Sequence, residues 1–296
     1  MKSSFENKWL PYFLLLPTFV ILVIFLFYPA IETFRLSFYK VHPFGITKKF
    51  AGFYNFGKIF TNKDYLNSFS TSLIFSVAVV VLGLAFSLLI ALLLNEKLKG
   101  VRIFRSLLIW PYALSPAVSG AIFRFLFNPA NGYLNYISEV ILGFEPKWLT
   151  NGELALVIVT IAATWKNLGY NIVFYLAGLQ NVQREALESA SIDGAGPVQK
   201  FWYITFPFLS PTTFFLLVMN IIYSYFASFG LIDVLTEGGP AKATQVVPIT
   251  VYRIAFEHLR LGRGAAAALI LLVFLLVLSA LFIRVLFANR SSSDEA

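Results

Sequence analysis

The chain has 296 residues, of which 58% are hydrophobic, 17% aromatic and only 13% charged, about half the charge of a typical soluble domain. The absence of cysteine excludes disulfides and thiolate metal sites, and two histidines are too few for a histidine-rich metal site. The net charge of +8 is not gathered into a basic cluster large enough to bind nucleic acid. These features predict an integral membrane protein of one domain, 1–296, without a metal site.

Six stretches are long and apolar enough to cross a membrane as helices, which takes about 20 residues. Their expected bounds are about 9–31, 68–94, 106–127, 154–180, 208–232 and 264–286. The first is too long for a signal peptide and lacks a small-x-small cleavage site, so we interpret it as a retained helix. An even number of spans places both termini on one side.

The distribution of Lys and Arg gives weak evidence on orientation. The short loop 95–105 holds four cations, which favours a cytoplasmic position for this loop and for both termini. The loop between the first two spans would then lie outside, although it holds five lysines. The charge rule therefore favours a cytoplasmic N-terminus only slightly.

Prolines are frequent within or beside the predicted spans. They are Pro11, Pro17, Pro29, Pro111, Pro116, Pro207 and Pro211. Each removes a backbone N–H and kinks a helix, which a membrane tolerates where neighbouring groups satisfy the freed carbonyl. Kinked spans are therefore expected, either as ordinary tolerated bends or as bent helices that line a path.

The segment between the fourth and fifth spans does not have the composition of a simple connector. Residues 182–192 are good helix formers, Gly194 stands where a C-cap would end them, and Pro197 prevents continuation. Ala186, Ala190 and Gly194 provide a surface of small residues that another protein can approach closely. The sequence thus predicts a short helix outside the membrane with a smooth docking face.

This segment resembles the signature cytoplasmic loop of ATP-binding-cassette (ABC) importer permeases. The family pattern reads Glu-Ala-Ala, three residues, Gly, nine residues, Ile, one residue, Leu-Pro. The matching positions here are Glu188, Ser189, Ala190, Gly194, Ile204, Phe206 and Pro207. Ser189 and Phe206 depart from the pattern in residue type, but the spacing is kept throughout, between two membrane spans.

The resemblance extends over most of the chain and is closest to the permeases of carbohydrate-uptake importers. Matching elements in the expected external loops are Gly52 with Asn55-Phe56, Phe127-Asn128-Pro129 with Gly132, and Gly238-Gly239-Pro240. Trp165-Lys166, Tyr170-Asn171 and the stretch 192–197 are most similar to family members that take up sn-glycerol 3-phosphate.

The resemblance implies the type I ABC importer permease fold, an all-α membrane protein of six kinked transmembrane helices with a cytoplasmic coupling segment at about 182–207. Such a permease is not an enzyme and holds no cofactor, because ATP and magnesium bind two copies of a partner ATP-binding subunit. A second homologous permease, membrane lipid and an extracytoplasmic substrate-binding protein are the other implied partners. The implied location is the bacterial cytoplasmic (inner) membrane, with the signature loop and both termini on the cytoplasmic side.

Two groups of functional residues are implied by the resemblance. The residues expected to couple the permease to the ATPase are Glu188, Ser189, Ala190, Asp193, Gly194, Gly196, Ile204 and Pro207. Glu188 has two open interpretations, a contact with a basic residue of the ATPase or a role at the end of its own helix. Gly238, Gly239 and Pro240 form either a plain turn or a contact for the binding protein.

One charged residue, Lys166, lies well inside a predicted span, where an unpaired lysine costs roughly 2.5–3.5 kcal/mol. It should therefore face the bundle interior or water, near Asn167 and Asn171, which share one helix face. A cation among hydrogen-bonding groups suits an anionic phosphate, and the alternative is a structural lysine paired with an acidic group on the partner permease. The candidate substrate path comprises Trp165, Lys166, Asn167, Asn171, Asn220 and Tyr223, with helix packing as the alternative role for its polar members.

The leading function is therefore the translocation path for sn-glycerol 3-phosphate or glycerophosphodiesters, driven by ATP hydrolysis on a partner. The alternative is a permease for maltose-like oligosaccharides or another sugar in the same machinery. An ion-coupled secondary transporter would need acidic residues within the spans, and none of the six has a central Asp or Glu. No cluster of acidic residues, histidines and an activated nucleophile indicates a catalytic site.

Overall fold

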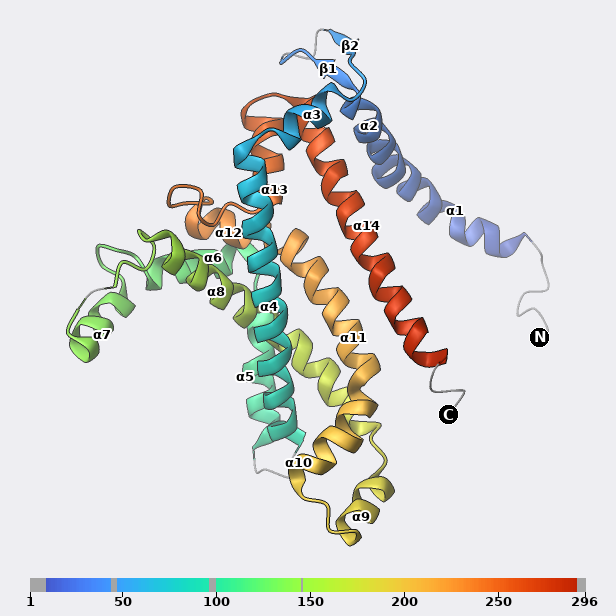
Figure 1. The fold of residues 1–296 in the computed structure, drawn as a ribbon, viewed down its shortest axis with the longest axis vertical. Coiled ribbons are helices and arrows are strands. Elements are labelled where there is room, and N and C mark those ends of the chain that lie inside the picture. Colours follow the sequence, from blue (N-terminus) through green and yellow to red (C-terminus); the bar gives the residue numbers. More distant parts are fainter. Residues whose placement is uncertain (1–8, 44–46, 96–99, 145, 292–296) are drawn as a thin grey trace. The chain divides into compact units, whose positions relative to one another are not determined.

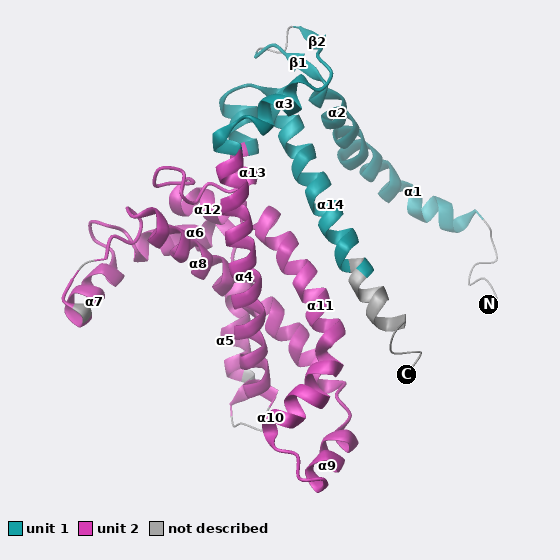
Figure 2. Cartoon of the chain, in the orientation of Figure 1, with its two compact units in different colours: residues 1–65, 251–296 teal, residues 66–250 magenta. Residues whose placement is uncertain are grey.

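The computed structural model describes residues 9–43, 47–95, 100–144 and 146–291, which are almost entirely helical (Figure 1). The chain divides into two compact units, 1–65 with 251–296, and 66–250 (Figure 2). The helical membrane fold is confirmed, with one short hairpin that the sequence did not reveal. The single domain stays a prediction.

The first unit joins the N-terminal helices to the last long helix. It contains, in order, α1 (Leu10–Leu22), the π-helix η1 (Val23–Phe27), α2 (Tyr28–Ser37), β1 (Tyr39–Val41), β2 (Lys48–Phe50), α3 (Tyr54–Phe60), η4 (Arg253–Glu257) and α14 (Leu261–Ser291). The two strands are antiparallel, with Lys40 opposite Lys49. The buried Asn55 amide donates to the carbonyls of Ser37 and Tyr39, at 2.8 and 2.9 Å, and so fixes the chain where it leaves α2.

The second unit contains the remaining spans and the short helices between them. They are α4 (Lys63–Asn95), whose first residues belong to the first unit, α5 (Val101–Ala113), α6 (Pro116–Leu126), α7 (Tyr133–Leu142), α8 (Gly152–Gln180), α9 (Arg184–Ile192), α10 (Pro197–Lys200), η2 (Phe201–Thr205), α11 (Phe206–Ile222), η3 (Tyr223–Ala227), α12 (Phe229–Thr236) and α13 (Val247–Tyr252), which ends just beyond the unit. In α8, 61% of the most apolar window is buried, against 33% in α4 and 22% in the stretch 197–227. α8 is therefore the core helix of this unit, which explains why the polar residues of the fourth span are inside.

Five helical stretches are long and apolar enough to span a membrane: Leu10–Ser37, Lys63–Asn95, Gly152–Gln180, Pro197–Ala227 and Leu261–Phe282. The predicted third span, 106–127, is instead two helices, α5 and α6, that meet at an angle of 101°. Leu114 and Ser115 are extended at this break, with ψ angles of 146° and 151°. The sequence explains the break, because Pro116 disfavours helical geometry in the residue before it, and the Ser115 side chain accepts the Val118 N–H and caps a new helix.

Contacts within the first unit determine whether the bent pair crosses the membrane. The start of α14 packs so closely on β1 that a Cβ at Gly262 would overlap the Tyr39 carbonyl oxygen. The chain therefore leaves the membrane after Ser37 and re-enters at Leu261 on the same face, which requires an even number of crossings between these points. α4, α8 and the stretch 197–227 provide three, so the bent pair is the fourth. With the bent pair counted as one span, the total is six, the number that the sequence predicts.

Two of the π-helical turns precede prolines. η1 and η2 end two residues before Pro29 and Pro207, and the Tyr28 and Phe206 N–H groups bond to carbonyls five residues earlier. A proline leaves the carbonyl four residues before it without its usual donor, so a local shift of the hydrogen-bond register accompanies it. At Pro29 and Pro207 a wide turn within a continuous helix therefore accompanies the proline.

The contact between α6 and α12 gives a test of this packing. A Cβ at Gly120 would lie 2.5 Å from the Leu231 carbonyl oxygen, and backbone atoms cannot move aside as a side chain can. We expect Gly120→Ala to lower the stability of the detergent-solubilised protein by about 1–3 kcal/mol, measured by thermal unfolding. Gly230→Ala is the matched control on the same helix pair, because its nearest neighbours are 3.7 Å away. Equal midpoints for the two variants would contradict the close approach.

Candidate functional site

The predicted helix outside the membrane is present as α9 and ends in a well-defined cap. Gly194 has a φ of +83° just past the helix. The Ala195 N–H donates to the Ala190 carbonyl at 2.8 Å, and the Gly194 N–H donates to the Ser191 carbonyl at 3.2 Å. This pair of bonds is the Schellman arrangement, in which glycine accepts the left-handed conformation without the cost a side chain would add. The prediction of a C-cap at Gly194 is confirmed.

α9 is bonded directly to the start of the fifth span. The Lys200 ammonium of α10 donates to the Ser191 hydroxyl at 2.6 Å, and that hydroxyl donates to the Leu187 carbonyl within α9. The Gly196 N–H donates to the Gln199 side chain at 2.9 Å, with Pro197 as the first helical residue. Capping at Gly196 starts the fifth span at Pro197, earlier than the predicted 208, and the coupling role of the segment 182–207 stays a prediction. Ile204 and Pro207 belong to that span.

The residues predicted to couple the permease to an ATPase are exposed or half-buried. Glu188, Ser189 and Asp193 are exposed, whereas Ala190, Gly196 and Ile204 are half-buried. Within the described part of the chain, no hydrogen bond or ion pair is found for the Glu188 carboxylate. The apolar side chain of Ile192, at the end of α9, is 87% exposed. The predicted coupling role of these residues stays a prediction.

A cavity of about 370 Å³ lies on the inner side of α9. Leu187 and Arg184 of α9 line it together with Leu92 of α4, Leu179 of α8 and Thr205 of η2. The space between α9 and the ends of these spans is therefore not filled by side chains of the described residues.

Three asparagines of the candidate substrate path form one buried cluster. Asn220 of α11 accepts hydrogen bonds from Asn167 and Asn171 of α8, at 2.9 and 3.1 Å. Its own amide donates to Asn171 at 2.8 Å and to the Leu216 carbonyl at 2.7 Å. A Cβ at Gly83 of α4 would lie 3.2 Å from the Asn220 side-chain oxygen, so the backbone of α4 packs directly against the cluster. The contacts within this chain are those of helix packing, and a substrate role for the asparagines stays a prediction.

Lys166 faces a different neighbour, the broken span. Its ammonium is 3.5 Å from the Tyr112 carbonyl oxygen and 5.4 Å from the centroid of the Tyr112 ring, and the residue is only 6% exposed. In a continuous helix that carbonyl would bond to residue 116, which is a proline without an N–H. Lys166 therefore supplies a donor and a positive charge at the C-terminal end of α5. Lys166 is therefore buried in the interior, as predicted, and a substrate role for it stays a prediction.

The other two candidate path residues also pack within the unit. The Trp165 ring contacts Phe123 of α6, with centroids 5.5 Å apart, and the Tyr223 hydroxyl donates to the Ala163 carbonyl at 3.1 Å. Trp165, Lys166 and Asn167 thus point toward three different elements, as successive residues of a helix must. The sequence alone did not reveal these partners, although Pro116 was the signal for a freed carbonyl at Tyr112.

The loop that contains the Gly-Gly-Pro sequence is stabilised by hydrogen bonds among its own residues. The Thr244 hydroxyl donates to the Gly239 carbonyl at 2.7 Å, and the Gly239 N–H donates to the Thr236 carbonyl at 2.8 Å. Gly238 is buried, and the exposed tip is formed by Ala241 and Lys242, with φ angles of 47° and 67°. Gly238 to Pro240 form the turn, and the two residues after them present the most exposed surface of the loop. A contact of Gly238, Gly239 and Pro240 with a binding protein stays a prediction.

The sequence matches a family model described as "Binding-protein-dependent transport system inner membrane component" over residues 83–293. It is 42% identical to the sn-glycerol-3-phosphate transport system permease protein UgpA of Rhizobium meliloti (strain 1021), over 93% of this chain and 94% of that protein. The protein of the same name from Yersinia pestis is 40% identical, over 98% of this chain and 97% of its own length.

Solved structures give the same picture of the fold. A bacterial ABC transporter involved in the import of the acidic polysaccharide alginate contains a chain that superposes with a TM-score of 0.82. The identity is 26%, and the match covers 97% of this chain and 96% of that one. An alginate transporter in complex with an alginate pentasaccharide-bound periplasmic protein gives a TM-score of 0.81 at 25% identity, over 93% of each chain.

The asparagine cluster predicts how substitutions combine. Asn220→Leu leaves the amides of Asn167 and Asn171 buried without their acceptor, so we expect a loss of about 1–2 kcal/mol in thermal unfolding of the purified protein. Asn171→Leu with Asn220→Leu should cost less than the sum of the single changes, because each removes a partner of the other. Asn181→Leu, at an exposed position beyond α8, is the control. Additive losses would show that the two asparagines do not interact.

Proposed function

The chain belongs to the family of binding-protein-dependent transport system inner membrane components, and we propose that it is the ABC importer permease that carries sn-glycerol 3-phosphate across the inner membrane. The observation that carries the substrate is 40–42% identity over nearly the full length to permeases named for it. Glycerophosphodiesters, which contain the same phosphoglycerol group, are included in the proposed range.

We propose α9 as the surface that binds the partner ATP-binding subunit. The Schellman cap at Gly194 fixes the C-terminal end of α9. The exposed side chains of Glu188 and Ile192 offer one charged and one apolar contact to a partner. Since Glu188 has no partner among the described residues, the contact with a basic residue of the ATPase is favoured over an intramolecular role. ATP and magnesium would bind two copies of that subunit, and a second permease would complete the path.

Movement of α9 would reach the core through covalent and hydrogen-bonded contacts. The stretch 197–227 is helical throughout and starts beside α9, to which the Lys200–Ser191 hydrogen bond ties it. The same stretch carries Asn220, which is bonded to two residues of α8. A displacement of α9 toward the ATPase would therefore move the fifth span against the fourth, and this relative movement is what alternating access requires.

The orientation follows from the same proposal. If α9 meets the ATPase in the cytoplasm, six crossings place both termini there as well. The hairpin and the loop tip at Ala241 and Lys242 then lie outside, where an extracytoplasmic substrate-binding protein would dock. The structure of an alginate transporter with its periplasmic protein gives a precedent for such a partner.

A sugar permease is the second candidate, because a solved relative at 26% identity imports a polysaccharide. The two substrates can be separated by uptake into proteoliposomes that contain the complete importer and its binding protein. We expect ATP-dependent uptake of radiolabelled sn-glycerol 3-phosphate, competed by unlabelled glycerophosphodiesters and not by maltose. Preferential uptake of maltose would reverse the assignment while leaving the permease function intact.

The docking role of α9 predicts a specific effect at its cap. Gly194→Val forces a β-branched residue into a conformation with φ of +83°, which costs about 1–3 kcal/mol locally and should break the cap. We expect the variant to insert normally, while the ATP-binding subunit that co-purifies with it and the rate of uptake both fall at least about fivefold.

Gly143→Val is the matched control for this variant. Gly143 also follows a helix, has a φ of +75° and has nothing within 4 Å of an added Cβ, but it lies after α7, outside the coupling segment. Uptake should be retained in this control. Normal uptake and normal co-purification of the ATPase with Gly194→Val would refute the docking role of α9.

A further inference from the structure

Nearly all of the net positive charge of the chain comes from two segments of the first unit. Residues 36–63 contain five lysines, and 258–263 contain two arginines, without any Asp or Glu in either segment. The net charge of the whole chain is +8. Both segments belong to the first unit, whereas α9 belongs to the second, so this charge is not part of the predicted coupling segment.

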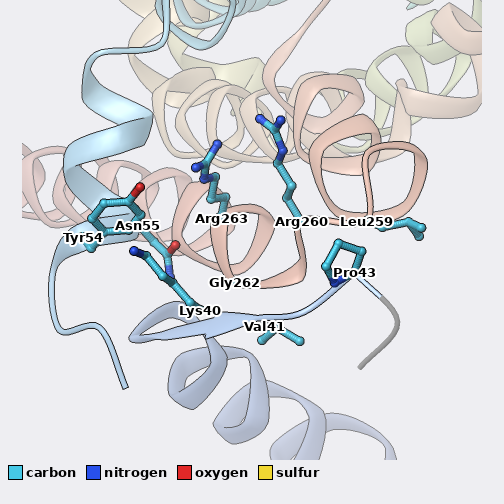
Figure 3. A pocket seen from close by; sticks show the side chains of 9 residues that line it. All are labelled: Lys40, Val41, Pro43, Tyr54, Asn55, Leu259, Arg260, Gly262 and Arg263. Carbon is cyan, nitrogen blue, oxygen red and sulfur yellow. The ribbon is translucent and has the colours of Figure 1, made fainter. Parts of the chain in front are cut away.

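The structure brings three of these cations to one pocket of about 250 Å³ (Figure 3). Lys40 comes from β1, Arg263 from the start of α14 and Arg260 from the residue just before it, and Tyr54 of α3 lines the same space. No acidic side chain is among the described residues that line it. Three like charges around one cavity repel one another, and a bound anion would relieve that repulsion.

Two of the three cations contact Tyr54. The Lys40 ammonium lies 3.6 Å from the centroid of the Tyr54 ring, and Arg263 donates a hydrogen bond to the Tyr54 hydroxyl. The nearby Lys40 charge lowers the pKa of Tyr54, which is the sign expected in a positive potential. The buried Asn55 and the close approach of Gly262 to the Tyr39 carbonyl fix the two backbone segments that carry the cations.

The pocket lies at the level where the spans meet water. α2 ends at Ser37, only three residues before Lys40, and α14 begins at Leu261, between Arg260 and Arg263. Phospholipid phosphates are found at this depth, and phosphorylated solutes reach it from the aqueous side. Guanidinium groups match the geometry of phosphate oxygens, and a lysine and a tyrosine hydroxyl add further donors.

We propose that this pocket is a binding site for a phosphate group, supplied either by a phospholipid headgroup or by a free phosphate monoester. The site uses none of the coupling residues and none of the candidate path residues. Its existence therefore does not depend on the substrate assigned to the importer, and a sugar permease could carry it equally well.

The test uses the full chain and two variants, Arg260→Gln and Lys40→Gln combined with Arg260→Gln. Arg260 is exposed, so its replacement should not disturb the fold. Lys49→Gln is the matched control, because it removes the same charge from the same hairpin at a residue that does not line the pocket. Thermal unfolding midpoints within a few degrees of the parent protein establish that all the variants are folded.

One arm measures lipid and the other a free monoester. In the first, native mass spectrometry of protein exchanged from maltoside detergent into phosphatidylglycerol micelles records how much lipid is retained. In the second, equilibrium dialysis of delipidated protein measures binding of radiolabelled sn-glycerol 3-phosphate, with inorganic phosphate and glycerol as competitors. We expect the double variant to weaken binding about tenfold in at least one arm, as loss of charge-assisted hydrogen bonds would.

Each outcome decides the proposal. A loss in the lipid arm alone identifies a headgroup site, and a loss in the dialysis arm, with competition by inorganic phosphate and not by glycerol, identifies a monoester site. Unchanged binding in both arms, or an equal loss with Lys49→Gln, overturns it. Unchanged binding together with weaker association of the substrate-binding protein would also overturn it, and would assign the cations to protein docking.

Discussion

The requirement that every buried backbone group find a hydrogen-bond partner shapes this protein more than any other constraint. In lipid there is no water to replace a missing donor, so a proline inside a span must be compensated by the protein itself. At Pro116 the compensation is a complete break of 101°, with a serine cap on one side and the Lys166 ammonium at the freed Tyr112 carbonyl on the other. At Pro29 and Pro207 a single π turn suffices, and the helix continues. The severity of each kink therefore depends on what lies next to the proline.

The same requirement explains the few polar residues that the spans contain. A lysine or an asparagine in a membrane helix is costly alone, so its position is fixed by the group that satisfies it. Lys166 is held by a carbonyl and the Asn220 cluster by its own members, and both are contacts of α8, the most buried span of the second unit. Polar side chains thus act as specific connections between helices whose apolar surfaces would otherwise slide along one another.

The sequence predicted the spans, the docking helix and its glycine cap because each depends on local composition and spacing. Gly194 could be placed from sequence because a C-cap needs only its own helix and the proline that follows. The partners of Lys166, Asn167 and Asn220 could not, because they come from residues about 50 positions away. The start of the fifth span was predicted at about 208, whereas Pro197, capped at Gly196, already begins that helix. The break at 114–115 was visible as Ser115-Pro116, but only its angle shows that one span had become two helices.

The distribution of charge distinguishes the two units. A low overall charge makes each remaining ionic group informative. In the second unit, α9 carries an exposed Glu188 carboxylate without a partner among the described residues. In the first unit, residues 36–63 and 258–263 carry seven cations and no Asp or Glu, and three of these cations line one cavity. Like charges around one cavity repel one another, so their arrangement needs a compensating group. A phosphate group bound at Lys40, Arg260 and Arg263 supplies that compensation, because it neutralises the charge where the helices enter the membrane.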